Sequence, residues 1–112
     1  MNEKEKNQII SAIFVLCLFI VTTIISIILL YNQFLQLKKQ KPLFNLSCAI
    51  DINLINNIVI IILTTFFLYN NYNSRSKYYK KERILASIFD VISASVVLYI
   101  AIDVYLNKDK FI

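Results

Sequence analysis

The sequence contains no glycine, no histidine and no tryptophan among its 112 residues, and it has one proline and two cysteines. Without glycine the chain cannot build a phosphate-binding loop, a dinucleotide-binding turn or a glycine-lined ion filter, because each needs backbone conformations that other residues avoid. Without histidine it lacks the usual haem ligand, a frequent zinc ligand and the base of most catalytic triads. The composition therefore argues against catalysis by this chain alone, and we expect no cofactor and no metal.

Charge is also scarce. Charged residues make up 17% of the sequence and hydrophobic residues 58%, whereas a soluble domain carries about 25% charged residues. A soluble domain this small needs polar groups over its whole surface, so the composition places the chain in a lipid bilayer. The net charge of +5 does not indicate nucleic acid as a partner, because the lysines lie between apolar runs, where they anchor membrane segments.

Three apolar segments, separated by short basic connectors, predict transmembrane helices at about 9–31, 42–69 and 84–106. The first would rise about 35 Å, enough to cross the roughly 30 Å of a bilayer's hydrocarbon core. Three segments cannot close a barrel, and an open sheet edge cannot face lipid, so the spans are helices rather than strands. The sequence predicts an all-α membrane protein, a single integral membrane domain over 1–112 with three transmembrane helices in a small bundle.

The connectors carry most of the basic residues. Lys38, Lys39 and Lys41 form a basic connector before the second span, and Pro42 is expected in the first turn of its helix, where a missing N–H is harmless. Seven basic residues share the side of the amino terminus and five lie on the other side. By the positive-inside rule, this count favours an amino terminus on the inner side of the membrane.

The two cysteines fall inside the first and second spans, which run antiparallel. Counted along the helices, Cys17 and Cys48 differ in height by roughly 10 Å, too far for a disulfide. Buried, inert thiols are therefore predicted.

Two carboxylates stand inside the spans, where an ionisable group costs several kcal/mol and is a functional candidate by default. Asp51 is the ninth residue after Pro42, about 14 Å deep, and Asp90 is the seventh after Arg83, about 10 Å from the opposite face. Each could take up and release a proton, or form a structural hydrogen bond to a neighbouring helix or subunit. Asp103, close to the end of its span, is expected to be solvated or paired with a lysine.

Amide side chains form a polar stripe on the second span. The stripe consists of Asn53, Asn56, Asn57 and Thr64. Asn57 is expected at the same depth as Asp90. There an amide could hold a water that carries a proton, or could bond one helix to another.

The third span has a face of mostly small residues at a spacing of three to four. This face consists of Ser87, Asp90, Ala94, Val97 and Ala101. Small residues let helix backbones approach closely, so the face is expected to be buried against a neighbouring helix. Three helices with buried polar groups form a thin bundle, and we expect other membrane subunits to cover what the bundle leaves exposed.

The arrangement resembles chain 4L of NADH:ubiquinone oxidoreductase, the NuoK-like subunit of complex I. Its members have about this length, three spans, a basic first connector, and buried carboxylates in the second and third helices. Here the connector reads Lys38-Lys39-Gln40-Lys41, Asp51 follows ten residues after Lys41, and Asp90 precedes the small-residue run Ser93-Ala94-Ser95. Both carboxylates are aspartates where the family has glutamates, and the second connector is a few residues longer.

The resemblance implies a membrane-arm subunit of the proton-pumping complex, located in a mitochondrial inner membrane or a bacterial cytoplasmic membrane. Such a subunit binds neither NADH nor an iron–sulfur cluster, and its partners are other membrane subunits. Its proton path would include Asp51 and Asp90, with Asn56 and Asn57 as neighbouring polar groups. In the family the first connector faces the matrix or cytoplasm, which is the opposite orientation to that favoured by the charge count.

Two other classes of protein fit the same pattern. One is a small three-span membrane effector, such as a holin-like pore former or a bacteriocin immunity protein. The other is a structural subunit of another membrane assembly, in which the aspartates only bond helices together.

Overall fold

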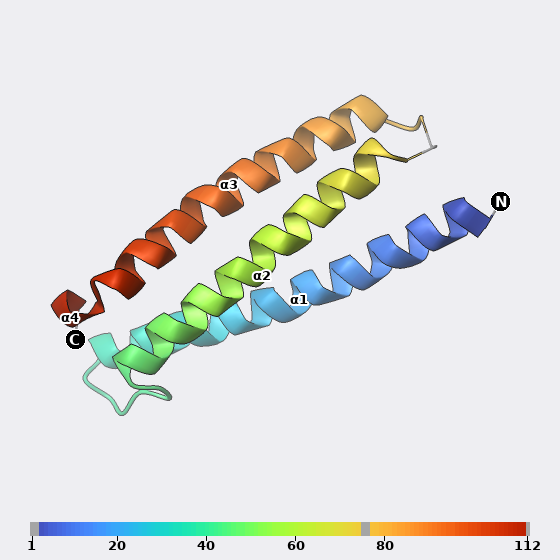
Figure 1. The fold of residues 1–112 in the computed structure, drawn as a ribbon. Coiled ribbons are helices and arrows are strands. Elements are labelled where there is room, and N and C mark those ends of the chain that lie inside the picture. Colours follow the sequence, from blue (N-terminus) through green and yellow to red (C-terminus); the bar gives the residue numbers. More distant parts are fainter. Residues whose placement is uncertain (1–2, 75–76, 112) are drawn as a thin grey trace.

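The computed structural model describes residues 3–74 and 77–111, which are helical without strands. Three long antiparallel helices, α1 (Glu3–Leu37), α2 (Leu46–Tyr72) and α3 (Lys80–Leu106), are followed by the short helix α4 (Lys108–Phe111) (Figure 1). All three long helices have the length and apolar composition to cross a membrane. The prediction of an all-α protein with three transmembrane helices is confirmed.

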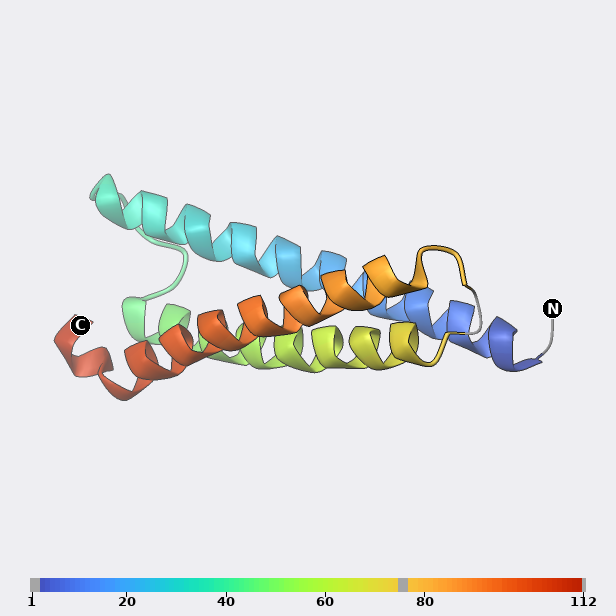
Figure 2. The same cartoon turned by 90° about the horizontal axis from the view of Figure 1, so that it is seen from above.

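The helix α2 lies between the other two. It packs against both α1 and α3, whereas no described residue of α1 has its Cα within 8 Å of one in α3. Figures 1 and 2 together show that α1 crosses α2 rather than running alongside it. The molecule measures 55 × 22 × 18 Å, so it is long and thin, with little interior.

The contacts of α2 with α3 follow a seven-residue spacing. Buried positions recur at this spacing on both helices: Ile50, Asn57, Thr64 and Asn71 on α2, and Ser87, Ala94 and Ala101 on α3. This is the period at which helices pack with a slight left-handed supercoil. Most of these side chains are small or polar. Small side chains let the two helix backbones approach closely, and polar side chains can form hydrogen bonds between the helices in lipid.

The second helix begins later than predicted. Its first residue is Leu46, and the Asn45 side chain caps it by accepting a hydrogen bond from the backbone N–H of Cys48 at 2.7 Å. Asparagine is among the best residues for this position because its oxygen satisfies an N–H that has no partner within the helix. The predicted start at Pro42 was therefore wrong, and residues of α2 lie nearer its beginning than the sequence suggested.

A hydrogen bond links the residues before Asn45 to α1. The backbone N–H of Phe44 donates to Oδ1 of Asn32 at 2.9 Å, and Asn32 is only 1% exposed. This bond replaces the helical bonding that a first turn at Pro42 would have provided.

The lack of glycine has a visible consequence at the end of α1. Gln40 N–H donates to the Leu35 carbonyl and Lys39 N–H to that of Gln36, both at 3.0 Å, which is the pattern of a Schellman cap. The left-handed residue of this cap, usually glycine, is Lys39 with φ 59°, and Tyr79 before α3 has φ 47°. Each left-handed residue costs about 1–2 kcal/mol.

Most of the surface of each helix faces outward. In the most apolar 18-residue windows of α1, α2 and α3, 11%, 22% and 17% of the residues are buried. Cys17 and Cys48 are both free and exposed. The prediction of buried thiols was therefore wrong, because a helix in so thin an arrangement shields only the stripe that meets its neighbour.

The antiparallel arrangement predicts that the two ends of the chain lie on opposite sides of the membrane, as the positions marked N and C suggest (Figure 1). In a variant with Cys17→Ala and Cys48→Ala, single cysteines at Lys4 and at Lys110 should react with a membrane-impermeant maleimide from opposite sides of sealed vesicles. Labelling of both positions from the same side would contradict three spans.

Candidate functional site

Asp51 forms an ion pair at one end of the bundle. Its Oδ1 lies 3.1 Å from Nζ of Lys108, which also approaches Ser47 Oγ at 3.4 Å. Asp51 follows Leu46 by five residues, or about 8 Å along the helix, and its side chain is 46% exposed. The predicted depth of about 14 Å was wrong, since the helix begins at Leu46. Exposed pairs of this kind contribute about 0–1 kcal/mol.

Asp90 lies near the middle of α3. It is ten residues from Lys80, about 15 Å along the helix, and about 24 Å from Leu106. Its side chain is exposed, and it has no hydrogen bond or ion pair with any residue that the structure describes. The expectation that its whole face is buried holds for Ser87, Ala94 and Ala101, but was wrong for Asp90 and Val97, which are both exposed.

The register of α2 against α3 sets the depth of Asn57. Asn71 bonds Ser87, Asn57 precedes Asn71 by 14 residues, and Ala101 follows Ser87 by 14. Asn57 is therefore opposite Ala101, about 16 Å from Asp90 along the bundle. The predicted common depth was wrong because α2 is displaced toward its carboxyl end relative to the expected span.

Asn57 and Asp90 nevertheless line one groove of about 530 Å³. Its floor is α2, and its two walls are α1 and α3. The residues with polar or exposed side chains in it are Leu16, Ser26, Asn57, Thr64, Asp90, Ser93 and Val97. Asn57 and Asp90 therefore lie in the same groove, although they are at different depths.

Asn56 faces α1 and acts as a link between helices. Its Nδ2 donates to the Thr22 carbonyl at 3.3 Å and to Ser26 Oγ at 3.1 Å, and the side chain is 4% exposed. Its Oδ1 is buried without a hydrogen-bond partner among the described residues. Asn57 instead donates to the carbonyl and side-chain oxygens of Asn53, one turn earlier on α2. For Asn56, the geometry favours the structural alternative that the sequence left open.

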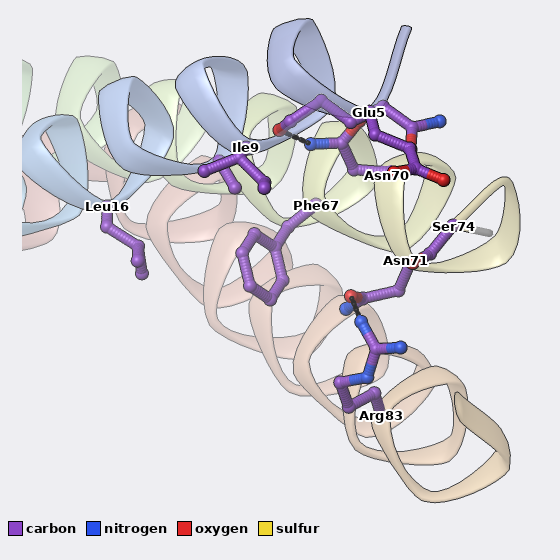
Figure 3. Close-up of a pocket in the computed structure, with 10 residues that line it drawn as sticks. Glu5, Ile9, Leu16, Phe67, Asn70, Asn71, Ser74 and Arg83 are labelled. Carbon is purple, nitrogen blue, oxygen red and sulfur yellow. Dashed lines mark hydrogen bonds between the residues drawn. The ribbon is translucent and has the colours of Figure 1, made fainter. Parts of the chain in front are cut away.

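A polar network joins the end of α2 to the start of α3, and the sequence analysis did not predict it. Asn71 Nδ2 donates to Ser87 Oγ at 2.6 Å, and Arg83 Nη1 donates to Asn71 Oδ1 at 3.3 Å (Figure 3). Ser87 in turn donates to the Arg83 carbonyl at 2.8 Å. The sequence does carry a signal for this network, because Asn71 continues the seven-residue spacing of Asn57 and Thr64.

The same end of the bundle contains the cavity of about 380 Å³ drawn in Figure 3. Asn70 Nδ2 donates to the Gln8 carbonyl at 3.3 Å, and Gln8 Nε2 donates to the Asn73 carbonyl at 3.0 Å. Glu5 and Arg83 also line the cavity. These contacts fasten the amino-terminal part of α1 to the end of α2.

The basic connector lies at the opposite end, beside the ion pair of Asp51. Lys38, Lys39 and Lys41 are all exposed, and Lys38 Nζ lies 4.5 Å from the ring centroid of Phe34. In the other connector, Arg75 falls outside the described residues.

The described residues do not form a cluster of metal ligands. No three histidine, cysteine, aspartate or glutamate side chains gather there as a metal site. No family model matches this chain, and no curated protein or solved structure matches it.

Proposed function

We propose that this chain is a non-catalytic subunit of a larger membrane complex, in which Asp90 takes part in proton transfer. The complex that the sequence resemblance indicates is the proton-pumping NADH:quinone oxidoreductase of a mitochondrial inner or bacterial cytoplasmic membrane, with this chain in its membrane arm. The observation that carries the proposal is an aspartate near the middle of an apolar helix, in a groove, without a partner in the described chain.

The need for other subunits follows from what the helices expose. A polar or ionisable side chain that faces lipid costs several kcal/mol, and such groups normally face a protein interior or a water-filled space. Asp90 is exposed on α3, and the groove beside it is open. A neighbouring subunit that covers the groove would remove this cost.

A role in proton transfer suits Asp90 better than Asp51. Asp90 lies about 15 Å along its apolar helix and lines a groove with other polar groups, whereas Asp51 is only about 8 Å from the start of α2 and pairs with Lys108 at the end of the bundle. Thr64 and Ser93 line the same groove. Hydroxyl groups of this kind can support bridging waters, which would extend a path from the carboxylate along the groove.

A structural subunit of another membrane assembly is the second candidate. It is favoured by the bonds of Asn56 to α1 and by the network around Asn71, since these polar groups are occupied in holding helices together. In that case Asp90 would serve only to bond a neighbouring helix.

The test compares Asp90→Asn, which cannot titrate, with Asp90→Glu, which can. We expect the Asn variant to assemble, because its amide oxygen still accepts a hydrogen bond. It should lower NADH-driven proton pumping in sealed vesicles by at least about tenfold, since a positioned proton-transfer group contributes about 10²–10⁴-fold. The Glu variant should retain most of the pumping. Asp103→Asn is the matched control, because Asp103 is exposed at the end of α3 and interacts there with Asn107.

Two measurements separate the candidates. Subunits that co-purify in mild detergent show whether the complex is an NADH:quinone oxidoreductase, and their absence would refute that assignment. Normal pumping by the Asp90→Asn variant within an assembled complex would instead show that Asp90 has a structural role and does not transfer protons.

A further inference from the structure

We infer that the groove between α1 and α3 receives one transmembrane helix of a different membrane protein, and that this helix carries a lysine or arginine at the level of Asp90. The inference rests on the proposed role as a subunit of a larger complex. It adds which surface makes the contact and which chemistry the partner brings.

The length of the groove suits one face of a helix. Its floor on α2 extends from Asn57 to Phe67, about 15 Å, which corresponds to about three helical turns. The walls belong to two helices whose backbones stay more than 8 Å apart (Cα to Cα), and the groove lies between them. On the α3 wall, Ser93 is small and exposed, which allows the close backbone approach by which helices associate in lipid.

The chemistry of the groove favours a cation. Asp90 and Ser93 have no hydrogen bond or ion pair with the described residues. An ionised carboxylate only accepts hydrogen bonds, and lysine and arginine are donors without acceptors. A charge-assisted bond to Asp90 would compensate for removing both charges from water.

A second copy of this chain does not supply that cation. Residues 7–37 carry no charge, and the charged residues of Leu46–Tyr72 and of 84–106 are aspartates. The nearest cation to Asp90 along α3 is Arg83, about 10 Å away and already bonded to Asn71. A lipid acyl chain could fill the space, but it has no hydrogen-bond donor.

The first experiment asks what lies in the groove of the full chain in its native membrane. A photoreactive benzoylphenylalanine is placed at Val97, which lines the groove and is 45% exposed. The matched control is Tyr99, which is 72% exposed and points to the far side of α3, two residues on. We expect Val97 to cross-link to a transmembrane peptide of another protein that contains a lysine or arginine, and Tyr99 to leave that peptide unlabelled.

The second experiment tests the charge pair. Asp90→Lys should lower recovery of the cross-linked partner by about tenfold or more, as expected for an opposed buried charge. Reversing the partner's basic residue to aspartate should restore recovery. Asp103→Lys is the control for added charge on α3, and cysteine labelling at Lys110 confirms that each variant inserts normally.

Several results would overturn the inference: a cross-link to a second copy of this chain, to lipid alone or to a helix without a basic residue, or a failure of charge reversal to restore the partner. The outcome is separate from the assignment to complex I. If the partner proves to belong to another assembly, the docking site remains and the assignment fails.

Discussion

Replacing Ala101 by leucine should weaken the packing of α2 against α3 by about 1–3 kcal/mol, the usual cost of adding methylene groups to a tightly packed position. Ala101 is only 2% exposed, and the helix register places it opposite Asn57. A leucine there has no room unless the two helices separate. Separation would also strain the hydrogen bond between Asn71 and Ser87, because it lies on the same seven-residue stripe.

Ala86→Leu is the matched control, since Ala86 lies on the same helix but is exposed. The free energy of unfolding can be followed by titration with a denaturing detergent, with fluorophores reporting the distance from α2 to α3. We expect the Ala86 variant to match the unsubstituted chain. Equal stability of the Ala101 variant would show that the small residues of α3 do not set the distance between the helices.

Asn71→Leu should cost about 2 kcal/mol, because it removes two hydrogen bonds and leaves the buried Ser87 hydroxyl and the Arg83 side chain with fewer partners. The effect is large for a single polar group because the network joins the ends of α2 and α3 next to their connector. Hydrogen bonds between membrane helices average less than this, about 0.6 kcal/mol, when the alternative state finds other partners.

A double-mutant cycle with Ser87→Ala isolates the pair. We expect a coupling energy of about 1 kcal/mol between the two positions. Asn73→Leu provides the control, because Asn73 is exposed and its amide donates to Tyr69 within the same helix turn. Additive effects of the Asn71 and Ser87 substitutions would contradict a direct bond between them in the membrane.

The polar groups within the spans divide into two kinds. Asn56, Asn71 and Ser87 are buried and take part in hydrogen bonds between helices. Asp90 and Ser93 line an open groove and have no partner in the part of the chain that the structure describes. The buried groups explain how the three helices are held together. The unpartnered groups in the groove indicate where another protein is needed.

The sequence by itself determined the membrane class and the helices. Runs such as residues 7–37 without a single charge leave no alternative in lipid, where every backbone group must bond within its own helix. The sequence also predicted the buried positions Ser87, Ala94 and Ala101 on α3 from their helical spacing, although Asp90 and Val97 on the same face are exposed. Ala94 and Ala101 are buried as expected.

Only the tertiary structure decided the depth and the partner of each polar group. The cap at Asn45 starts α2 at Leu46, which brings Asp51 to the end of the bundle beside Lys108. That pair depends on how α2 sits against the end of α3, and no local pattern records it. The register between helices likewise separates Asn57 from Asp90, because sliding one helix along another changes every cross-helix pair while leaving each helix's own periodicity intact.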